Sequence, residues 1–133
     1  MSIHSSPQWT IRPATRTDAR PLAELFYTSY HPSHPFWSII FPRNNDVTEF
    51  WTEAFLKVID APTVHVFTVV AKEPAKERII GMGAWERCQA DWSPFPWPQP
   101  PESVPKDVGG PFFGGLGQNR AKLMKGKAHW SEF

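Results

Sequence analysis

The sequence predicts an α+β fold in which two amphipathic helices and a β-hairpin follow a short first strand. Residues 18–30 and 46–60 place apolar side chains at helical spacing. Residues 63–71 form an apolar, β-branched run that is typical of a strand inside a covered sheet. Residues 78–87 form a similar run after the polar segment 72–77. The expected order is therefore strand, helix, helix, strand, strand, with the last two strands antiparallel.

The beginning of the chain is expected to supply one strand, one helix and a loop. Trp9–Arg12 is a short candidate strand that ends at Pro13. Thr17 or Asp18 can cap the helix that follows. Its buried face repeats at i, i+3, i+4 and i+7 through Leu22, Leu25, Phe26 and Ser29. Residues 31–45 contain three prolines and end in Arg-Asn-Asn, which predicts a loop.

The second helix and the hairpin are expected to form the core. The apolar stripe of the helix comprises Val47, Phe50, Trp51, Ala54 and Val58. Gly81 and Gly83 lie two residues apart, so both lack a side chain on the same face of their strand, and a close approach to the backbone is expected there. The hairpin is apolar on both faces, and two helices cover only one of them. Its other face and its free edge are expected to need a partner.

The pattern changes after Cys88. Seven prolines lie between Ser93 and Pro111, which predicts a polyproline-like linker rather than a packed element. We expect a flexible N-terminus over 1–8, a folded unit over 9–90 and a Pro/Gly-rich loop over 91–117. The remaining residues, 118–133, predict a short helix and the beginning of a further strand at His129.

Composition excludes several classes of function. The net charge is +1, and no basic stripe favours nucleic acid or a membrane surface. No apolar run is long enough to cross a bilayer, and the N-terminus lacks the basic and apolar regions of a secretory signal. The single cysteine, Cys88, allows no internal disulfide, which fits a reducing compartment. We therefore expect a cytoplasmic protein with no nucleic-acid or membrane partner.

A family resemblance lies in the order of several short motifs. The chain opens with Ile11-Arg12-Pro13-Ala14-Thr15, followed by Asp18-Ala19 and Leu22-Ala23-Glu24-Leu25-Phe26. These residues resemble the opening of a GNAT-superfamily acetyltransferase, whose first strand reads I-R-x-A and whose first helix reads D-A-x-x-L-A-x-L. Residues 66–70 and 79–85 are similar to the second and third strands of that family. The Pro-rich loop and the stretch from Met124 to Trp130 resemble a branch common in filamentous fungi.

This resemblance implies an enzyme that transfers an acetyl group from acetyl-CoA to the amine of a small molecule or peptide. In the family, His129-Trp130 would begin the fourth strand, and the loop that holds the acetyl-CoA pyrophosphate follows that strand. The resemblance therefore covers the front half of the family domain, about residues 9–130, with a fourth strand that is truncated at Phe133. A Gly-x-Gly at Gly115 and Gly117 precedes a helix, so these two residues are the candidates for a displaced phosphate loop.

The candidate site residues fall into two groups. In the resembled family, the loop between the first two helices forms a wall of the acceptor pocket. The residues expected to contact the acceptor are Tyr30, His31, His34, Phe36, Trp37 and Trp85. Glu86 is the candidate base, because a carboxylate near the acceptor could take a proton from an ammonium, directly or through water. A proline-braced surface loop and a solvent-facing strand end are the alternatives for these two groups.

Other chemistry is less well supported by the sequence. His31 and His34 lack the third and fourth ligands of a zinc site, so no metal is expected. Cys88 has no base placed beside it in the sequence and is interpreted as a small buried hydrophobe. Two alternatives to an enzyme remain. One is a relic or fragment without catalysis, and the other is an interaction module whose exposed sheet edge pairs with another chain, including a second copy.

Overall fold

A computed structural model describes residues 8–30 and 33–132 of the chain. Its elements are, in chain order, β1 (Trp9–Pro13), a 3-10 turn (Arg16–Asp18), α1 (Ala19–Tyr30), α2 (Pro35–Ile40), α3 (Asn45–Asp60), β2 (Val64–Lys72), β3 (Glu77–Cys88), α4 (Lys106–Met124) and β4 (His129–Glu132). The predicted α+β class is confirmed. The predicted first strand, first two long helices and hairpin all appear, with boundaries that differ by one residue.

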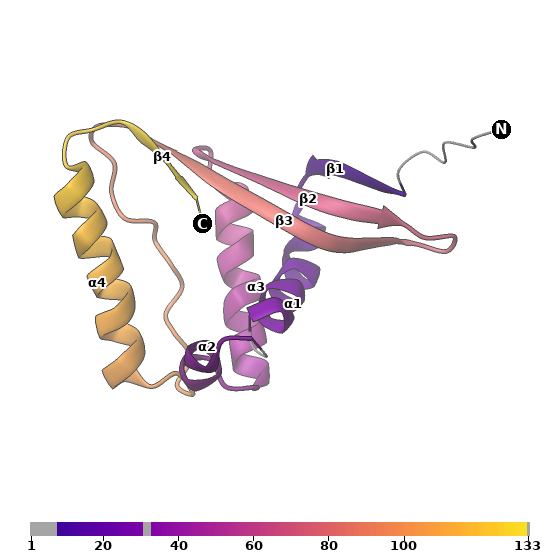
Figure 1. Cartoon of the computed structure of the whole chain (residues 1–133), viewed down its shortest axis with the longest axis horizontal. Helices are drawn as coiled ribbons and strands as arrows, with labels where there is room; N and C mark the ends of the chain where they lie inside the picture. Colours follow the sequence, from indigo (N-terminus) through magenta and orange to yellow (C-terminus); the bar gives the residue numbers. More distant parts are fainter. Residues whose placement is uncertain (1–7, 31–32, 133) are drawn as a thin grey trace.

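The four strands form one antiparallel sheet in the order β1-β2-β3-β4 (Figure 1). Ile11 lies opposite Val69, and Phe67 lies opposite Gly83. Trp85 in turn lies opposite Glu132 at the β3–β4 end. A β-bulge interrupts the β2–β3 register at Val69/Val70. The chain therefore runs across the sheet strand by strand, with α1, α2 and α3 all inserted between β1 and β2.

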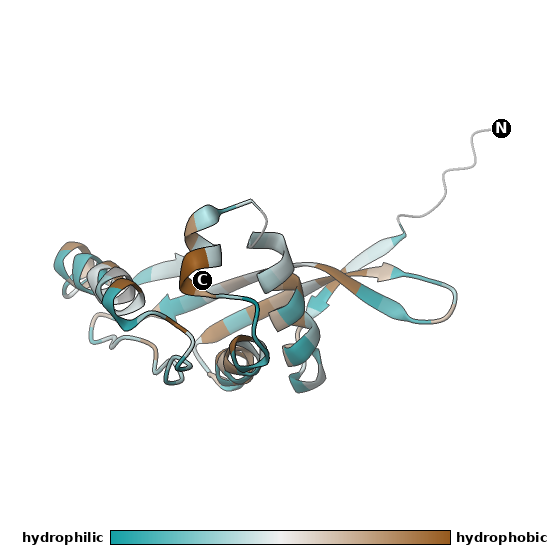
Figure 2. Cartoon of the chain, turned by 90° about the horizontal axis from the view of Figure 1, so that it is seen from below, coloured by the Kyte–Doolittle hydropathy of each residue, from teal (hydrophilic) through white to brown (hydrophobic). Residues whose placement is uncertain are grey.

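The hydrophobic core lies between the sheet and the helices α1 and α3, which cover one face only (Figure 1). The alternating burial of β2 shows this face directly, because Val64, Val66, Thr68 and Val70 are buried and the residues between them are not. Figure 2, seen from below the view of Figure 1, shows hydrophobic stretches of the central strands where the helices cross them. The hairpin end that projects beyond the helices is hydrophilic.

Two expectations about the loops are wrong. Within the predicted loop 31–45, residues 35–40 form α2, with Pro35 in its first turn, where a missing N–H costs no helical hydrogen bond. Trp, Ser and Ile are indifferent helix formers, so propensity alone did not reveal the turn. Burial of Ile40 and Phe41 stabilises it.

The C-terminal third also differs from the prediction. The helix expected at Gln118 begins instead at Lys106, so α4 takes in residues 106–117 of the predicted Pro/Gly-rich loop 91–117 and carries Pro111 in its interior. The segment before α4 has no regular secondary structure, as expected, but it is packed: Pro98 is buried and the Trp97 ring lies 6.5 Å from the Trp51 ring. Within the described residues, no helix is long and apolar enough to cross a membrane.

Candidate functional site

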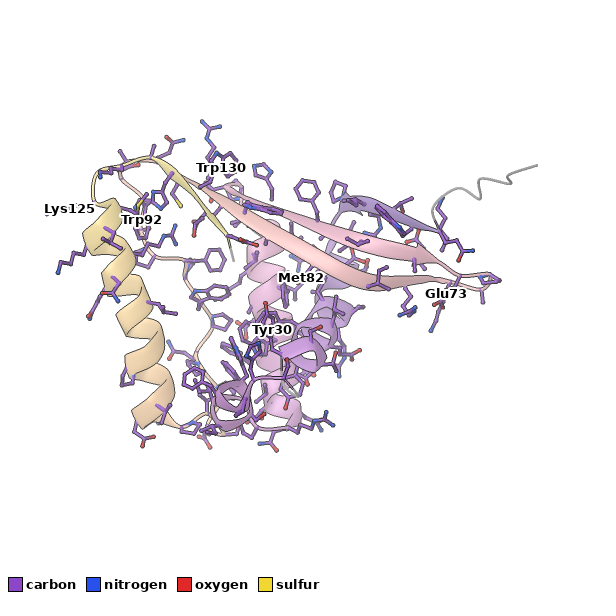
Figure 3. The ribbon with its side chains drawn as sticks, viewed as in Figure 1. Tyr30, Glu73, Met82, Trp92, Lys125 and Trp130 are labelled. Carbon is purple, nitrogen blue, oxygen red and sulfur yellow. The ribbon has the colours of Figure 1, made fainter. Side chains whose placement is uncertain are left out.

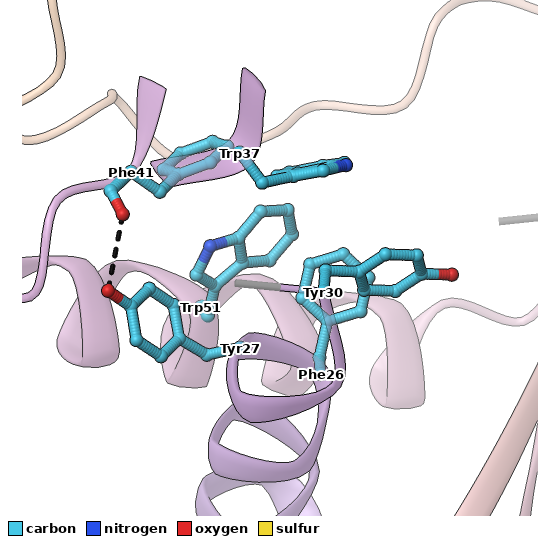
Figure 4. A pocket seen from close by; sticks show the side chains of 6 residues that line it. All are labelled: Phe26, Tyr27, Tyr30, Trp37, Phe41 and Trp51. Carbon is cyan, nitrogen blue, oxygen red and sulfur yellow. Dashed lines mark hydrogen bonds between the residues drawn. The ribbon is translucent and has the colours of Figure 1, made fainter. Parts of the chain in front are cut away.

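An aromatic cluster joins the end of α1 to α2 and α3 (Figure 4). It comprises Phe26, Tyr27, Tyr30, Trp37, Phe41 and Trp51. The Phe26 and Trp51 rings are 4.5 Å apart between centroids, and the Trp37 ring stacks on Phe41 at 5.3 Å. These are the spacings of close aromatic packing. The cavity that remains between the six side chains has a volume of about 10 Å³, which is about the space of one water molecule.

Polar atoms in the aromatic cluster are few. The Tyr27 hydroxyl donates to the Phe41 carbonyl oxygen at 3.2 Å, which closes the cluster on one side (Figure 4). Burial raises the pKa of Tyr27, so this hydroxyl stays protonated at neutral pH. The Trp51 indole Nε1 is buried, and no acceptor for it lies among the described residues. The cluster is therefore an almost closed apolar pocket with one inward donor.

The structure brings together some, but not all, of the residues predicted to contact an acceptor. Tyr30 and Trp37 belong to the aromatic cluster, and the His34 ring lies 5.9 Å from the Tyr30 ring. Phe36 lies on α2 and is partly exposed. His31 lies outside the described residues. Trp85 is on the opposite face of the sheet, because it precedes Glu86 in β3 and adjacent strand residues point to opposite faces.

Glu86 belongs to a second group of side chains that surrounds Arg120 of α4. The Arg120 cluster comprises Glu86, Cys88, Trp92, Arg120 and His129. Arg120 Nη2 lies 3.4 Å from Glu86 Oε2, 2.7 Å from Cys88 Sγ and 3.3 Å from His129 Nε2. The guanidinium carbon is 4.2 Å from the centre of the Trp92 ring, a cation–π contact, and Figure 3 shows Trp92 beside the end of α4.

The two ring nitrogens of His129 have different partners. Arginine only donates, so His129 Nε2 accepts from Arg120, and His129 Nδ1 lies 2.8 Å from the Lys127 carbonyl oxygen. Burial and the neighbouring Glu86 carboxylate raise the pKa of Cys88, so its thiol stays protonated at neutral pH. Cys88 is buried as predicted. Because the thiolate is the nucleophilic form of cysteine, the protonated thiol of Cys88 is a poor nucleophile.

The aromatic cluster and Glu86 lie at different ends of α3. Trp51 is in the N-terminal half of this helix, whereas Glu86 lies opposite Val64, where β2 begins after the helix has ended. The helix length from Trp51 to Asp60 is about 14 Å. The polar partner that the structure gives Glu86 is Arg120, and an amine would have to displace that guanidinium to reach the carboxylate.

Gly115 and Gly117 lie inside α4 and not in a loop. Inside a helix each backbone N–H is bonded to the carbonyl four residues earlier, so it is not free to hold a phosphate oxygen. A Cβ placed on either glycine would meet no other atom within 4 Å. The described residues therefore form no pyrophosphate cradle at the predicted position.

Metal-ligating side chains and surface depressions are the remaining features that bear on a site. No group of three His, Cys, Asp or Glu side chains within residues 8–30 and 33–132 could hold a metal ion. An open depression of about 230 Å³ lies where β1, β2 and α3 end or begin, and it is lined by Pro13, Ala14, Ile59, Val64, His65, Val66 and Phe67.

Comparisons with protein-family models, with curated proteins and with solved structures gave no match.

Sequence reasoning missed the centre of the Arg120 cluster. Phe26 and Trp51 were expected in the core from their helical spacing, and they lie there. Arg120 gave no signal, because an arginine in a basic helix ordinarily faces solvent. Trp92 lies in the irregular segment before α4, where no periodicity indicates which way a side chain points.

Proposed function

We propose that these residues form the acceptor half of a GNAT-type N-acetyltransferase domain. The observation that carries the proposal is the arrangement of the strands. The motifs that resemble the family lie on β1, β2, β3 and β4, and these four strands are sheet neighbours in chain order. The helices between β1 and β2 pack on a single face of that sheet. A resemblance scattered over unrelated parts of the fold would not have this order.

In this proposal the aromatic cluster and Glu86 have separate tasks. The aromatic cluster, with His34 and Phe36 beside it, forms a wall of the acceptor side. An apolar or cationic group would contact its rim, because the cavity itself holds about one water molecule. Glu86 is paired with Arg120 and is the carboxylate that accepts a proton from the acceptor ammonium. Because Glu86 is buried and paired, α4 must move Arg120 aside before that proton transfer.

Acetyl-CoA supplies the acyl group in this class of reaction. The described residues do not fit its pyrophosphate, since the amides of Gly115 and Gly117 are used within α4. Contacts to that group would have to come from residues other than those described.

Calorimetric titration of acetyl-CoA into the chain tests the proposal, with circular dichroism to verify folding. The expected result is weak binding, on the order of 0.1–1 mM, because the described residues hold no pyrophosphate, and an E86Q variant that binds equally well but transfers no acetyl group to a panel of amines. Asp91→Asn is the matched control, because Asp91 is an exposed carboxylate outside both clusters. A folded chain that gives no heat with acetyl-CoA contradicts the proposal.

One observation favours a second function, a non-catalytic interaction module. Glu86 is already neutralised by Arg120, and the aromatic cluster leaves room for about one water molecule. Both features are typical of a packed protein interior rather than of an open binding site. A folded chain that associates with protein but binds no acetyl-CoA would support this second function.

A further inference from the structure

The sheet face opposite α1 and α3, here called the outer face, is apolar across all four strands. Its large side chains are Trp9, Ile11, Phe67, Trp85 and Trp130, with exposures of 49%, 62%, 37%, 41% and 61%. The register places them on one face: Ile11 pairs with Val69, two residues from Phe67, and His65 pairs with Trp85. Among the described residues, no element covers this face (Figure 1).

The aromatic side chains of the outer face form a continuous surface. The Phe67 and Trp85 rings are 6.5 Å apart, and the Trp130 ring reaches His65 at 5.9 Å across the intervening strand. The six-membered ring of the Trp85 indole lies next to Gly83, where an added Cβ would approach it to 2.6 Å. The missing side chains at Gly81 and Gly83 thus leave a shallow surface that the Trp85 indole partly fills. Figure 3 shows Trp130 on the side of the sheet away from the helices.

We infer that the outer face binds the outer face of a second copy of this chain, with two-fold symmetry. The exposed apolar area is of the right size. Five large side chains, each about half exposed, offer roughly 500 Å² per copy. Two copies would bury about 1,000 Å² of apolar area together, close to the apolar share of a standard interface of about 1,600 Å².

The charges on the outer face favour a second copy over a partner of one sign. Arg87 lies opposite Trp130, and Glu132 lies opposite Trp85, so both point to this face at its β3–β4 end. Neither residue forms an ion pair within residues 8–30 and 33–132. In a two-fold interface the same surface of both copies is in contact. Arg87 of each copy can therefore face Glu132 of the other copy, which gives two equivalent ion pairs. A surface for nucleic acid or anionic lipid would instead carry an excess of basic side chains.

Sedimentation equilibrium of the full chain between about 1 and 100 µM tests this inference. We expect a reversible dimer. R87E should weaken the dimer by about tenfold or more, because like charges then meet across the two-fold axis. The double variant R87E/E132R should restore it, since the pair is reversed in both copies. Such a rescue is not expected from a change in stability alone.

A second pair of variants separates this face from the rest of the surface. F67T/W130T removes apolar area from the outer face and should leave a monomer. Leu123→Ser is the control, because Leu123 is the most exposed large apolar side chain described and lies on α4; the dimer should persist in it. Circular dichroism verifies that each variant is folded.

Three results would overturn the inference. One is a wild-type chain that stays monomeric over the whole concentration range. Another is a dimer that R87E and F67T/W130T leave unchanged, which would indicate pairing through a strand edge. The third is a monomer that binds neutral lipid vesicles through its tryptophans. None of these measurements uses acetyl-CoA, so their outcome is independent of the proposed transferase activity.

Discussion

Arg12 and Asp18 form a bidentate ion pair that connects β1 to the turn leading into α1. Arg12 Nη1 lies 2.7 Å from Asp18 Oδ2, and Nη2 lies 3.0 Å from Oδ1. The Thr15 backbone N–H donates to the same carboxylate at 2.7 Å. Asp18 is buried, so these three donors replace the water that its carboxylate has lost.

The ion pair of Arg12 and Asp18 predicts a loss of stability in acid. Hydrogen bonding to Arg12 lowers the pKa of Asp18 from 3.8 to about 2, although burial opposes the shift. A carboxyl whose pKa is depressed by folding stabilises the fold fully above its unfolded pKa. That stability is lost as the pH falls from about 4 towards about 2. The shift corresponds to about 2 kcal/mol.

Urea unfolding of wild type and Asp18→Asn measures this contribution. At neutral pH the variant should lose about 2 kcal/mol of unfolding free energy, and the difference should shrink below pH 4. Asp91→Asn, which removes an exposed carboxylate, should track wild type at every pH. A D18N deficit that stays constant down to pH 2 would show that charge is not the cause.

The contact of Arg120 with β3 predicts that this one side chain holds the C-terminal half of α4. Arg120→Ala removes a charge-assisted hydrogen bond and leaves the Glu86 carboxylate buried without its partner. Amides near residue 120 should exchange about 10- to 100-fold faster, as measured by hydrogen–deuterium exchange. Lys122→Ala is the matched control, since Lys122 is exposed on the same helix. Equal exchange in the two variants would contradict this prediction.

The packing of Trp85 over Gly83 predicts that Gly83 tolerates no side chain. In Gly83→Ala the new Cβ would lie 2.6 Å from the Trp85 ring, so the indole must leave its place. We expect a loss of about 1–3 kcal/mol in unfolding free energy, together with a changed indole N–H resonance for Trp85. An unchanged resonance would show that the ring does not rest on this glycine.

The open surroundings of Gly114 predict the opposite effect at another glycine. Gly114 lies inside α4, and a Cβ there would meet no atom within 4 Å. Gly114→Ala should therefore raise helix stability by about 0.5–1 kcal/mol, because alanine loses less backbone entropy on folding. Slower amide exchange across α4 is the expected readout, and faster exchange would show that the glycine serves another purpose.

Periodicity accounts for what could be predicted of this fold, and its absence for what could not. The stripes through Leu22 and Val47 indicated two core helices, and the β-branched run at residues 63–71 indicated the central strand. α4 has no apolar stripe, and its glycines and Pro111 have low helix propensities, so the sequence does not indicate a helix there. In the site, Tyr30 and Trp37 were predicted from one loop, but Arg120 reaches Glu86 through tertiary structure that no local pattern encodes.

The edge position of β1 also bears on the order in which the sheet can assemble. β2 and β3 are joined by a short loop and can pair within microseconds, as hairpins do. Trp9 and Ala71, by contrast, pair across roughly 60 residues, so β1 can dock only after the chain between them has closed, at an entropic cost that grows with its length. Arg12 and Asp18 are separated by only six positions in the sequence, so their side chains can pair before that closure. We therefore expect β1 to pair with β2 late in folding, when the Arg12–Asp18 ion pair already links β1 to the start of α1.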